Sequence, residues 1–336
     1  MTQNKHSFLR ALLIASLVIG LFTLTGCTKK SAAQTSAANL QLDLKAPFRF
    51  VAYGDTRFHD PKDFDAANPP VRAALVQAVA DANPAFICFT GDIVYNGYDT
   101  ADWKVFDRET SVWRERKIPV YPALGNHDLH GDENVALANY FQRFTDLKNS
   151  RYYSVRAANT LLLVLDSALD ELAGPQGQWL TSQLDHVPDS VNFIFVMDHH
   201  PPYTSSSDEK KFGGGHSARG KELALAKMFE DRQAHAKYRI IFFSGHVHNY
   251  ERHEHGGITY FVSGGGAAHA YPIERAPGDL FQSKEINYHY LLVEVDRQQV
   301  AITMNRLEMT SGKPVWTQPD SVKIMAPAGA AAAAGH

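Results

Sequence analysis

The chain has 336 residues, of which 44% are hydrophobic and 21% are charged. This composition excludes an intrinsically disordered protein and predicts a globular one with one sizeable core or two modest ones. Its 33 basic and 36 acidic side chains nearly balance, so the charge carries no nucleic-acid-binding signature. The charge balance identifies no partner, so the partners of the protein have to be inferred from the residues of its candidate functional site.

The N-terminal segment has the features of an export signal. Lys5 and Arg10 lie at the start of an apolar stretch, residues 11–24, that is too short to span a bilayer comfortably. Residues 24–27 read Leu-Thr-Gly-Cys and resemble a bacterial lipobox. The resemblance implies that residues 1–27 are a lipoprotein signal peptide and that Cys27 is lipidated, which would anchor the protein on the periplasmic side of the cell envelope.

Two alternatives to a lipoprotein signal stay open at this point. A signal peptide can end near a cysteine by coincidence, and a single uncleaved segment can act as a signal anchor. In lipoproteins, threonine rather than aspartate after the lipidated cysteine favours the outer membrane, and Thr28 stands here.

The rest of the chain divides into a linker, one domain and a tail. Residues 28–46 are rich in Ala, Ser, Gln and Thr and predict a flexible tether. The catalytic domain is expected over residues 47–325, and the low-complexity residues 326–336 are expected to be disordered. Cys88 lies inside an apolar run, which predicts a buried thiol.

Strands and helices alternate along the domain. Short apolar runs predict strands over residues 48–53, 86–89, 120–124, 193–197 and 240–243, and helical spacing of apolar residues predicts helices over 71–80, 102–114, 135–144, 176–184 and 221–229. A hairpin is expected over residues 152–165, and a later β group over 258–262, 288–295 and 300–305. This order predicts an α/β fold in which two mixed sheets pack together with helices outside.

A polar cluster follows each of five predicted strands. The clusters hold carboxylate, phenol, amide and imidazole groups: Asp55, Asp92 with Tyr95, Asn126-His127-Asp128, His199-His200 and His246-Val247-His248. If the strands deliver them side by side to one sheet edge, they form a site for two metal ions. Asp92 is the candidate bridge, because a carboxylate can bind two cations. One metal can be completed by Asp55, Tyr95 and His248, and the other by Asn126, His199 and His246.

The motifs resemble those of the calcineurin-like metallophosphoesterases and, within them, the purple acid phosphatases. They are Gly-Asp, Gly-Asp-x-x-Tyr, Gly-Asn-His-Asp, Val-x-x-His and Gly-His-x-His, and the resemblance covers residues 47–306. It implies a four-layer αββα sandwich with Asp92 bridging two metals. The first metal, usually Fe(III), would be held with Asp55, Tyr95 and His248, and a divalent Fe, Zn or Mn with Asn126, His199 and His246.

Position 57 departs from the common pattern. Most metallophosphoesterases carry Asp-x-His in the first motif, but Arg57 stands here, and a guanidinium group stays protonated and cannot bind a metal. Tyr95 offsets the missing donor, because a strongly Lewis-acidic ion such as Fe(III) can displace the phenol proton. Arg57 is then free to act as a cationic clamp on the substrate phosphate. Purple acid phosphatases more often have glycine at this position, so the substrate pocket diverges from theirs.

Three histidines are further candidates. In related enzymes the histidine of Gly-Asn-His contacts the phosphate and is implicated in protonating the leaving oxygen, which makes His127 the catalytic candidate; Asp128 would hold its imidazole in one tautomer. His216 lies in a glycine-rich loop where related phosphatases carry another active-site histidine, and an ordinary solvated loop histidine is the alternative. The motif spacing assigns the ligand to His199 and leaves His200 as a candidate supporting or substrate contact.

Together these features predict a dinuclear-metal hydrolase of small-molecule phosphate esters. The leading hypothesis is an acid-phosphatase-like phosphomonoesterase in which a metal-bound hydroxide attacks phosphorus. A phosphodiesterase or a nucleotide hydrolase on the same scaffold is the near alternative. A non-catalytic lipoprotein that binds metal or phosphate is a third.

Overall fold

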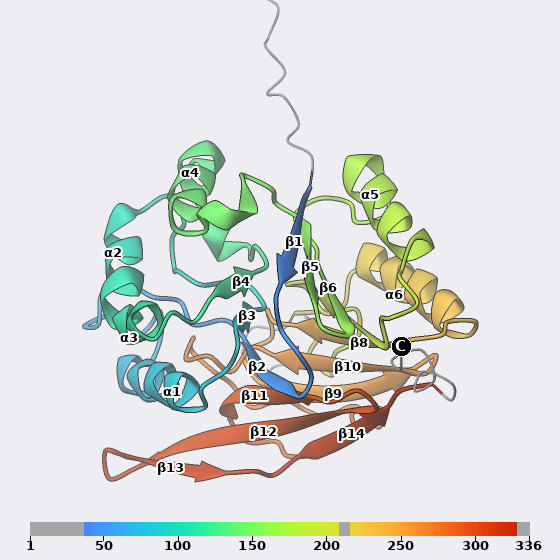
Figure 1. Ribbon diagram of the computed structural model, residues 1–336. Helices are drawn as coiled ribbons and strands as arrows, with labels where there is room; N and C mark the ends of the chain where they lie inside the picture. Colours follow the sequence, from blue (N-terminus) through green and yellow to red (C-terminus); the bar gives the residue numbers. More distant parts are fainter. Residues whose placement is uncertain (1–36, 208–215, 328–336) are drawn as a thin grey trace, which may run out of the picture. The chain divides into compact units, whose positions relative to one another are not determined.

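Two β-sheets form the centre of the fold, with helices on either side of them (Figure 1). The computed structural model describes residues 37–207 and 216–327. The predicted signal peptide and Cys27 lie outside the described residues, as does the predicted tail from residue 328 onward.

The first sheet has seven strands in the order β1-β5-β6-β7-β8-β10-β9. Their bounds are β1 Ala38–Leu42, β5 Tyr153–Ala157, β6 Thr160–Val164, β7 Phe193–Met197, β8 Arg239–Ser244, β10 Ile258–Ser263 and β9 Tyr250–His255. β6, β7, β8 and β10 are parallel neighbours, whereas β5 and β9 run antiparallel to their partners β6 and β10. The sheet is therefore mixed.

The second sheet has the order β13-β12-β11-β2-β3-β4, with β14 also paired to β12. Its strands are β13 Lys313–Thr317, β12 Gln299–Thr310, β11 Tyr288–Val295, β2 Phe48–Tyr53, β3 Ile87–Phe89, β4 Val120–Pro122 and β14 Ser321–Met325. β2, β3 and β4 are parallel neighbours, and the later strands add antiparallel pairs.

The helices fall into two groups along the chain. They are α1 Pro69–Asp81, α2 Thr100–Glu109, α3 Ser111–Glu115, α4 Glu133–Arg143, α5 Gly174–Asp185 and α6 Gly220–Gln233, with 3-10 turns at His127–Leu129 and Thr145–Leu147. In Figure 1, α1 to α4 lie on the left and α5 and α6 on the right.

Alternating side chains on β7 show how the layers are built. Phe193, Phe195 and Met197 belong to the larger core, where the rings of Phe195 and Phe50 of the second sheet meet edge to face at 5.0 Å. Ile194 and Val196 point the other way, into a second core with the apolar residues of α5 and α6. Because successive strand residues face opposite sides, this sheet separates α5 and α6 from the second sheet. The predicted four-layer αββα arrangement is confirmed.

The predicted tether boundary is wrong at its C-terminal end. Residues 38–42 form β1, which pairs in parallel with β5. The apolar residues Ala38, Leu40 and Leu42 alternate with polar ones, and the apolar side of the strand faces the larger core. The sequence expectations also omitted β9, β13 and β14. Strands β13 and β14 are largely exposed, so they lack the apolar runs on which the expectations rested.

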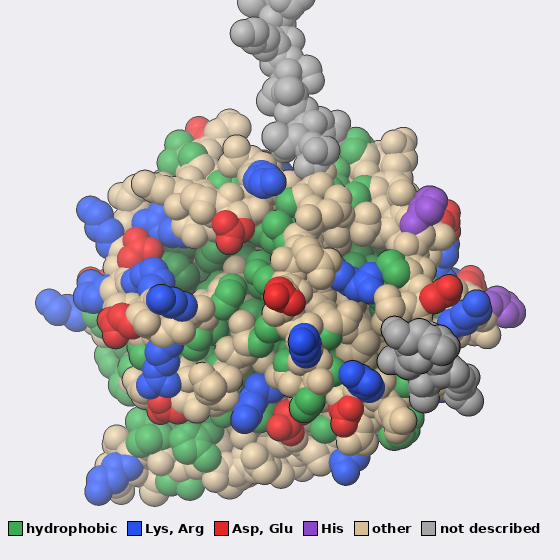
Figure 2. Space-filling model, viewed as in Figure 1, with side chains coloured by type: hydrophobic (Ala, Val, Ile, Leu, Met, Phe, Trp, Pro, Cys, Tyr) green, Lys and Arg blue, Asp and Glu red, His purple; other side chains and the backbone are tan. Residues whose placement is uncertain are grey.

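The surface carries both signs of charge. On the face shown in Figure 2, Lys and Arg side chains are interspersed with Asp and Glu rather than gathered by sign. Among the helices within residues 37–207 and 216–327, none is both long and apolar enough to cross a bilayer.

Candidate metal centre

Strand ends from both sheets bring the predicted ligands together. Asp55, Asp92 and Asn126 follow β2, β3 and β4 of the second sheet, whereas His199 and His246 follow β7 and β8 of the first. The expectation that all of them lie at the edge of one sheet is therefore wrong. The ligands from each sheet follow neighbouring parallel strands, whose carboxyl ends meet at one edge of that sheet. The two sheet edges face each other across the site.

The turns that carry the ligands are tight and strained. Asp55, Asp92 and His246 have φ values of 58°, 53° and 67°, in the left-handed region that is unfavourable for residues with a side chain. Gly125 also has to be a glycine, since a Cβ there would lie 2.3 Å from the Asp92 carboxylate. Such local strain clusters at functional sites and persists only where the surrounding structure holds it.

The first donor group contains Asp55, Asp92 and His248, all buried, with one ligand atom from each within 4.8 Å of the others. His248 Nε2 lies 3.6 Å from Asp55 Oδ1, and neither atom has a hydrogen-bond partner. His248 Nδ1 is 2.8 Å from the carbonyl oxygen of His269 and must donate to it, so Nε2 presents a lone pair. Two buried acceptor atoms that face each other without a hydrogen-bond donor are unfavourable, and a cation bound between them would stabilise both.

The second donor group contains Asn126, His199 and His246. Asn126 Oδ1 lies 3.0 Å from His199 Nε2 and 3.1 Å from His246 Nδ1, and the two imidazole nitrogens are 3.2 Å apart. His199 donates its Nδ1–H to the Thr90 carbonyl oxygen at 2.8 Å, so its Nε2 is also a lone pair. This set of one amide oxygen and two imidazole nitrogens suits a divalent transition metal.

Asp92 joins the two groups. It belongs to the first group, and its Oδ1 lies 3.4 Å from His199 Nε2 in the second. The same oxygen accepts the backbone N–H of His127 at 2.9 Å. Asp92 therefore occupies the position that a bridging carboxylate requires.

Burial and neighbouring charges shift the pKa values of the imidazoles and carboxylates at the site. Burial lowers the pKa values of His199, His246 and His248, so their lone pairs are available to a metal at neutral pH. Burial and the negative charge of Asp92 raise the pKa of Asp55. Burial opposes ionisation of Asp92 as well, but basic neighbours, first among them His199, outweigh it and lower the pKa of Asp92.

Arg57 contacts the first group, whereas Tyr95 packs against neighbouring histidines. An Arg57 guanidinium nitrogen is 3.2 Å from Asp92 Oδ2, so in this structure the guanidinium neutralises the shared carboxylate. The Tyr95 ring packs between His59, at 4.9 Å between ring centroids, and His127, at 5.2 Å. The phosphate contact of Arg57 and the metal bond of Tyr95 stay predictions.

The predicted role of Asp128 is wrong. His127 Nδ1 is held by the Tyr95 carbonyl oxygen at 2.7 Å. Asp128 is fully buried and accepts backbone N–H groups of Ile93, Val94 and Gly125 at 2.9 to 3.2 Å. It therefore ties together the two turns that carry Asp92 and Asn126, and it acts on the site through the backbone. Burial, reinforced by Asp92, raises the pKa of Asp128 to about 8.

The structure brings two further predicted histidines to the second donor group. The His246 ring lies between the rings of His216, at 4.1 Å, and His200, at 4.2 Å. Residues 208–215, which precede His216, lie outside the described residues.

Sequence reasoning missed His59 and His130. His59 is held by Asp102 at 2.5 Å, and the His130 ring lies 4.5 Å from that of His127. Neither residue belongs to a recognisable motif. Only their closeness in sequence to Asp55 and His127 pointed to the site.

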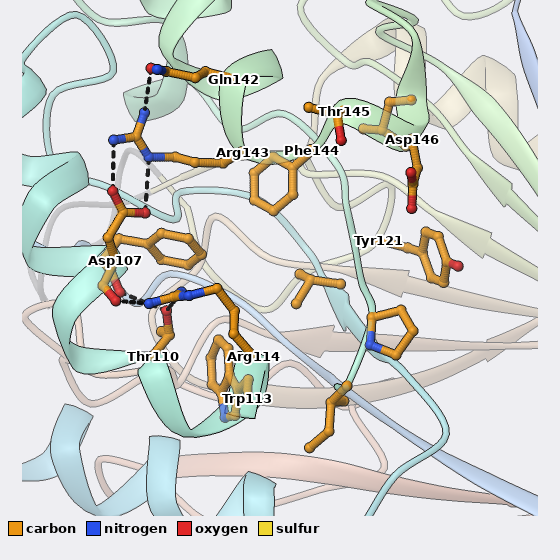
Figure 3. Close-up of a pocket in the computed structure, with 15 residues that line it drawn as sticks. Asp107, Thr110, Trp113, Arg114, Tyr121, Gln142, Arg143, Phe144, Thr145 and Asp146 are labelled. Carbon is orange, nitrogen blue, oxygen red and sulfur yellow. Dashed lines mark hydrogen bonds and ion pairs between the residues drawn. The ribbon is translucent and has the colours of Figure 1, made fainter. Parts of the chain in front are cut away.

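A separate cavity of about 500 Å³ lies away from these ligands (Figure 3). Its lining comes from α2, α3, α4, β4 and the adjoining turns, with Trp113, Tyr121 and Phe144 as aromatic walls and the Asp107–Arg143 ion pair at one side. None of the candidate metal ligands lines it. The chemistry of the protein is therefore not expected there.

Comparisons with known proteins find similar phosphoesterases. The family model for calcineurin-like phosphoesterases matches residues 48–250, more than half of the chain. Purple acid phosphatase 1 of Ipomoea batatas is 27% identical over 187 residues, which cover 50% of this chain and 37% of that protein. The Fe(3+)-Zn(2+) purple acid phosphatase 12 of Arabidopsis thaliana is 25% identical over 200 residues, or 53% of this chain and 39% of that protein.

The fold is also shared with a solved structure. Purple acid phosphatase PPD1 from yellow lupin (Lupinus luteus) seeds superimposes with a TM-score of 0.64 at 15% identity, over 84% of this chain and 54% of that one. The chain spans less than half of the length of the two curated relatives.

The backbone role of Asp128 predicts a loss of stability. In metal-free protein, Asp128→Ala leaves three buried N–H groups without an acceptor and should lower the free energy of unfolding by about 3 kcal/mol or more. Asp132→Ala is the matched control, because Asp132 caps α4 from an exposed position and should cost only about 1 kcal/mol. Urea unfolding measures both. Equal losses in the two variants would contradict the assigned role.

Proposed function

The chain belongs to the calcineurin-like phosphoesterase family, and from this premise we propose that it is a two-metal phosphatase that hydrolyses phosphate monoesters. The observation that carries the proposal is the pair of donor groups that share Asp92. The first has unpartnered acceptor atoms, and the second brings an amide oxygen and two imidazole nitrogens close together. The names of the relatives, which are purple acid phosphatases, support the monoester class.

The proposed ligands follow the two groups. The first metal would be held by Asp55, Asp92, Tyr95 and His248, and the second by Asp92, Asn126, His199 and His246. A phenolate donor favours Fe(III) at the first position, and the donors of the second suit divalent Fe, Zn or Mn. The Fe(3+)-Zn(2+) relative supports such a mixed pair. When bound, the pair would supply Lewis acidity toward phosphate oxygens and lower the pKa of a coordinated water.

Three side chains of the chain would act on the substrate. Arg57 reaches Asp92 from a half-buried position, so a short movement of its guanidinium would let it clamp a phosphate oxygen. His127 would donate a proton to the leaving oxygen, with its Nδ1 fixed by Tyr95 and Nε2 as the proton-carrying atom. His216 lies beside His246 and would contact the phosphate from the segment that precedes α6.

The protonation of His127 bears on the reaction conditions. Burial lowers its pKa to about 4, against the opposing charge of Asp92. Its proton-donating form is therefore favoured in acid, as expected for an acid phosphatase.

Turnover of matched aryl phosphate mono- and diesters tests the proposed function. Full-length protein loaded with iron and either Zn, Mn or Fe should hydrolyse the monoester faster. His127→Ala should lower kcat by about 10² to 10⁴, the usual contribution of a general acid, and Asp92→Asn should abolish turnover. His235→Asn, at an exposed position just beyond the end of α6, is the control and should match the wild type.

The other outcomes separate the alternatives. A faster diester reaction would move the assignment to a phosphodiesterase or nucleotide hydrolase. Two bound metals without turnover of either ester would contradict the phosphatase and support a non-catalytic metal-binding or phosphate-binding protein.

Export and lipid anchoring are a separate proposal that rests on the sequence of residues 1–27. Cys27 would carry the lipid and hold the domain at the periplasmic side of the outer membrane. In cells fed labelled palmitate, the protein should take up the label, and Cys27→Ala should not. Label in both proteins, or in neither, would argue against this anchor.

A further inference from the structure

His200 lies within the second donor group although the proposed ligand set does not use it. One nitrogen from each of His199, His200 and His246 lies within 4.8 Å of the others. The His200 ring is 4.9 Å from that of His199 and 4.2 Å from that of His246. Adjacent residues inside a strand point to opposite faces, but β7 ends at Met197, so both histidines can turn to the same site.

A buried serine fixes the orientation of His200. Ser167 Oγ lies 2.8 Å from His200 Nδ1, and Ser167 is only 1% exposed. Two cations hold the backbone of that serine, since its carbonyl oxygen accepts Arg219 at 3.0 Å and Lys221 at 2.5 Å. The imidazole is therefore held from its outer side, with Nε2 directed away from Ser167.

The same arrangement occurs at two ligands of the proposed pair. His199 and His248 each donate the outer Nδ1–H to a backbone carbonyl oxygen at 2.8 Å, which leaves Nε2 as the lone pair. Histidines that bind metals are usually fixed through their second nitrogen in this way. Ser167 can accept such a proton from His200, because a hydroxyl oxygen is also an acceptor.

We propose that His200 is an additional imidazole ligand of the second metal and that Ser167 is its positioning residue. The inference rests on the proposed two-metal function and deepens it. The second metal would then have three imidazoles, the Asn126 amide and the shared Asp92 carboxylate as protein donors. Imidazole suits Zn and Fe, whereas carboxylate, carbonyl and water suit Mn. His200 would therefore bias the second site toward Zn²⁺ or Fe²⁺ over Mn²⁺.

Metal affinity tests the proposal without reference to turnover. Full-length protein stripped of metal is titrated with Zn²⁺ or Mn²⁺ against a competing chelator, and bound metal is counted. His200→Asn should weaken binding of the second Zn²⁺ by about a hundredfold. Ser167→Ala should weaken it by about tenfold, which is within the range found for residues that hold a ligating histidine. Mn²⁺ affinity should fall less, so the Zn²⁺/Mn²⁺ ratio should drop. His235→Asn is again the control.

A spectroscopic count distinguishes a ligand from a nearby imidazole. In Co²⁺-substituted protein, each ligating histidine whose outer nitrogen keeps its proton gives a paramagnetically shifted N–H resonance, and His200→Asn should remove one. Ser167→Ala retains the imidazole, and its expected tenfold loss of Zn²⁺ affinity keeps the proposal testable even where His200→Asn fails to fold.

The outcomes separate this inference from the proposed function. If the wild type binds two metals and hydrolyses esters, but folded His200→Asn keeps both Zn²⁺ affinities within twofold and loses no resonance, the role of His200 is overturned and the phosphatase stands. If the wild type binds fewer than two metals, the two-metal function fails and the inference fails with it.

Discussion

Two buried carboxylates beside several imidazole lone pairs are the feature on which the rest of the structure depends. Asp55 Oδ1 and His248 Nε2 face each other at 3.6 Å without a donor, and Asp92 lies within reach of both donor groups. Burying such groups without compensation costs several kcal/mol per charge. Arg57 offsets part of this cost at Asp92, and a pair of cations would offset the rest.

The sheets supply the rigidity that this arrangement needs. Parallel strand ends from two sheets set the direction of each ligand, and Asp128 ties the turn after β3 to the turn after β4 through backbone N–H groups. Left-handed turns at Asp55, Asp92 and His246 each cost on the order of 1–3 kcal/mol. Packing between the sheets, as at Phe50 and Phe195, holds them in place.

Local patterns predicted most of the fold and most of the candidate site. Apolar runs such as 193–197 and the helical spacing of 71–80 identified the elements, and the polar residues at strand ends identified the donor groups. Strand β1 was missed although its apolar residues alternate with polar ones. It directly follows a polar stretch, and its partner β5 lies more than a hundred residues later in the chain. The contacts of Asp128 with Ile93 and Val94, and that of His200 with Ser167, were not predictable either, because they join segments that only the assembled sheets bring close.

Anomalous diffraction from crystals of the protein loaded with iron and zinc tests the account most directly, with data collected across both absorption edges. The account predicts two peaks about 3.5–4 Å apart, iron beside Asp55 and His248 and zinc beside Asn126, His199 and His246, with Asp92 in contact with both. A single peak, or two peaks that do not share Asp92, would contradict it.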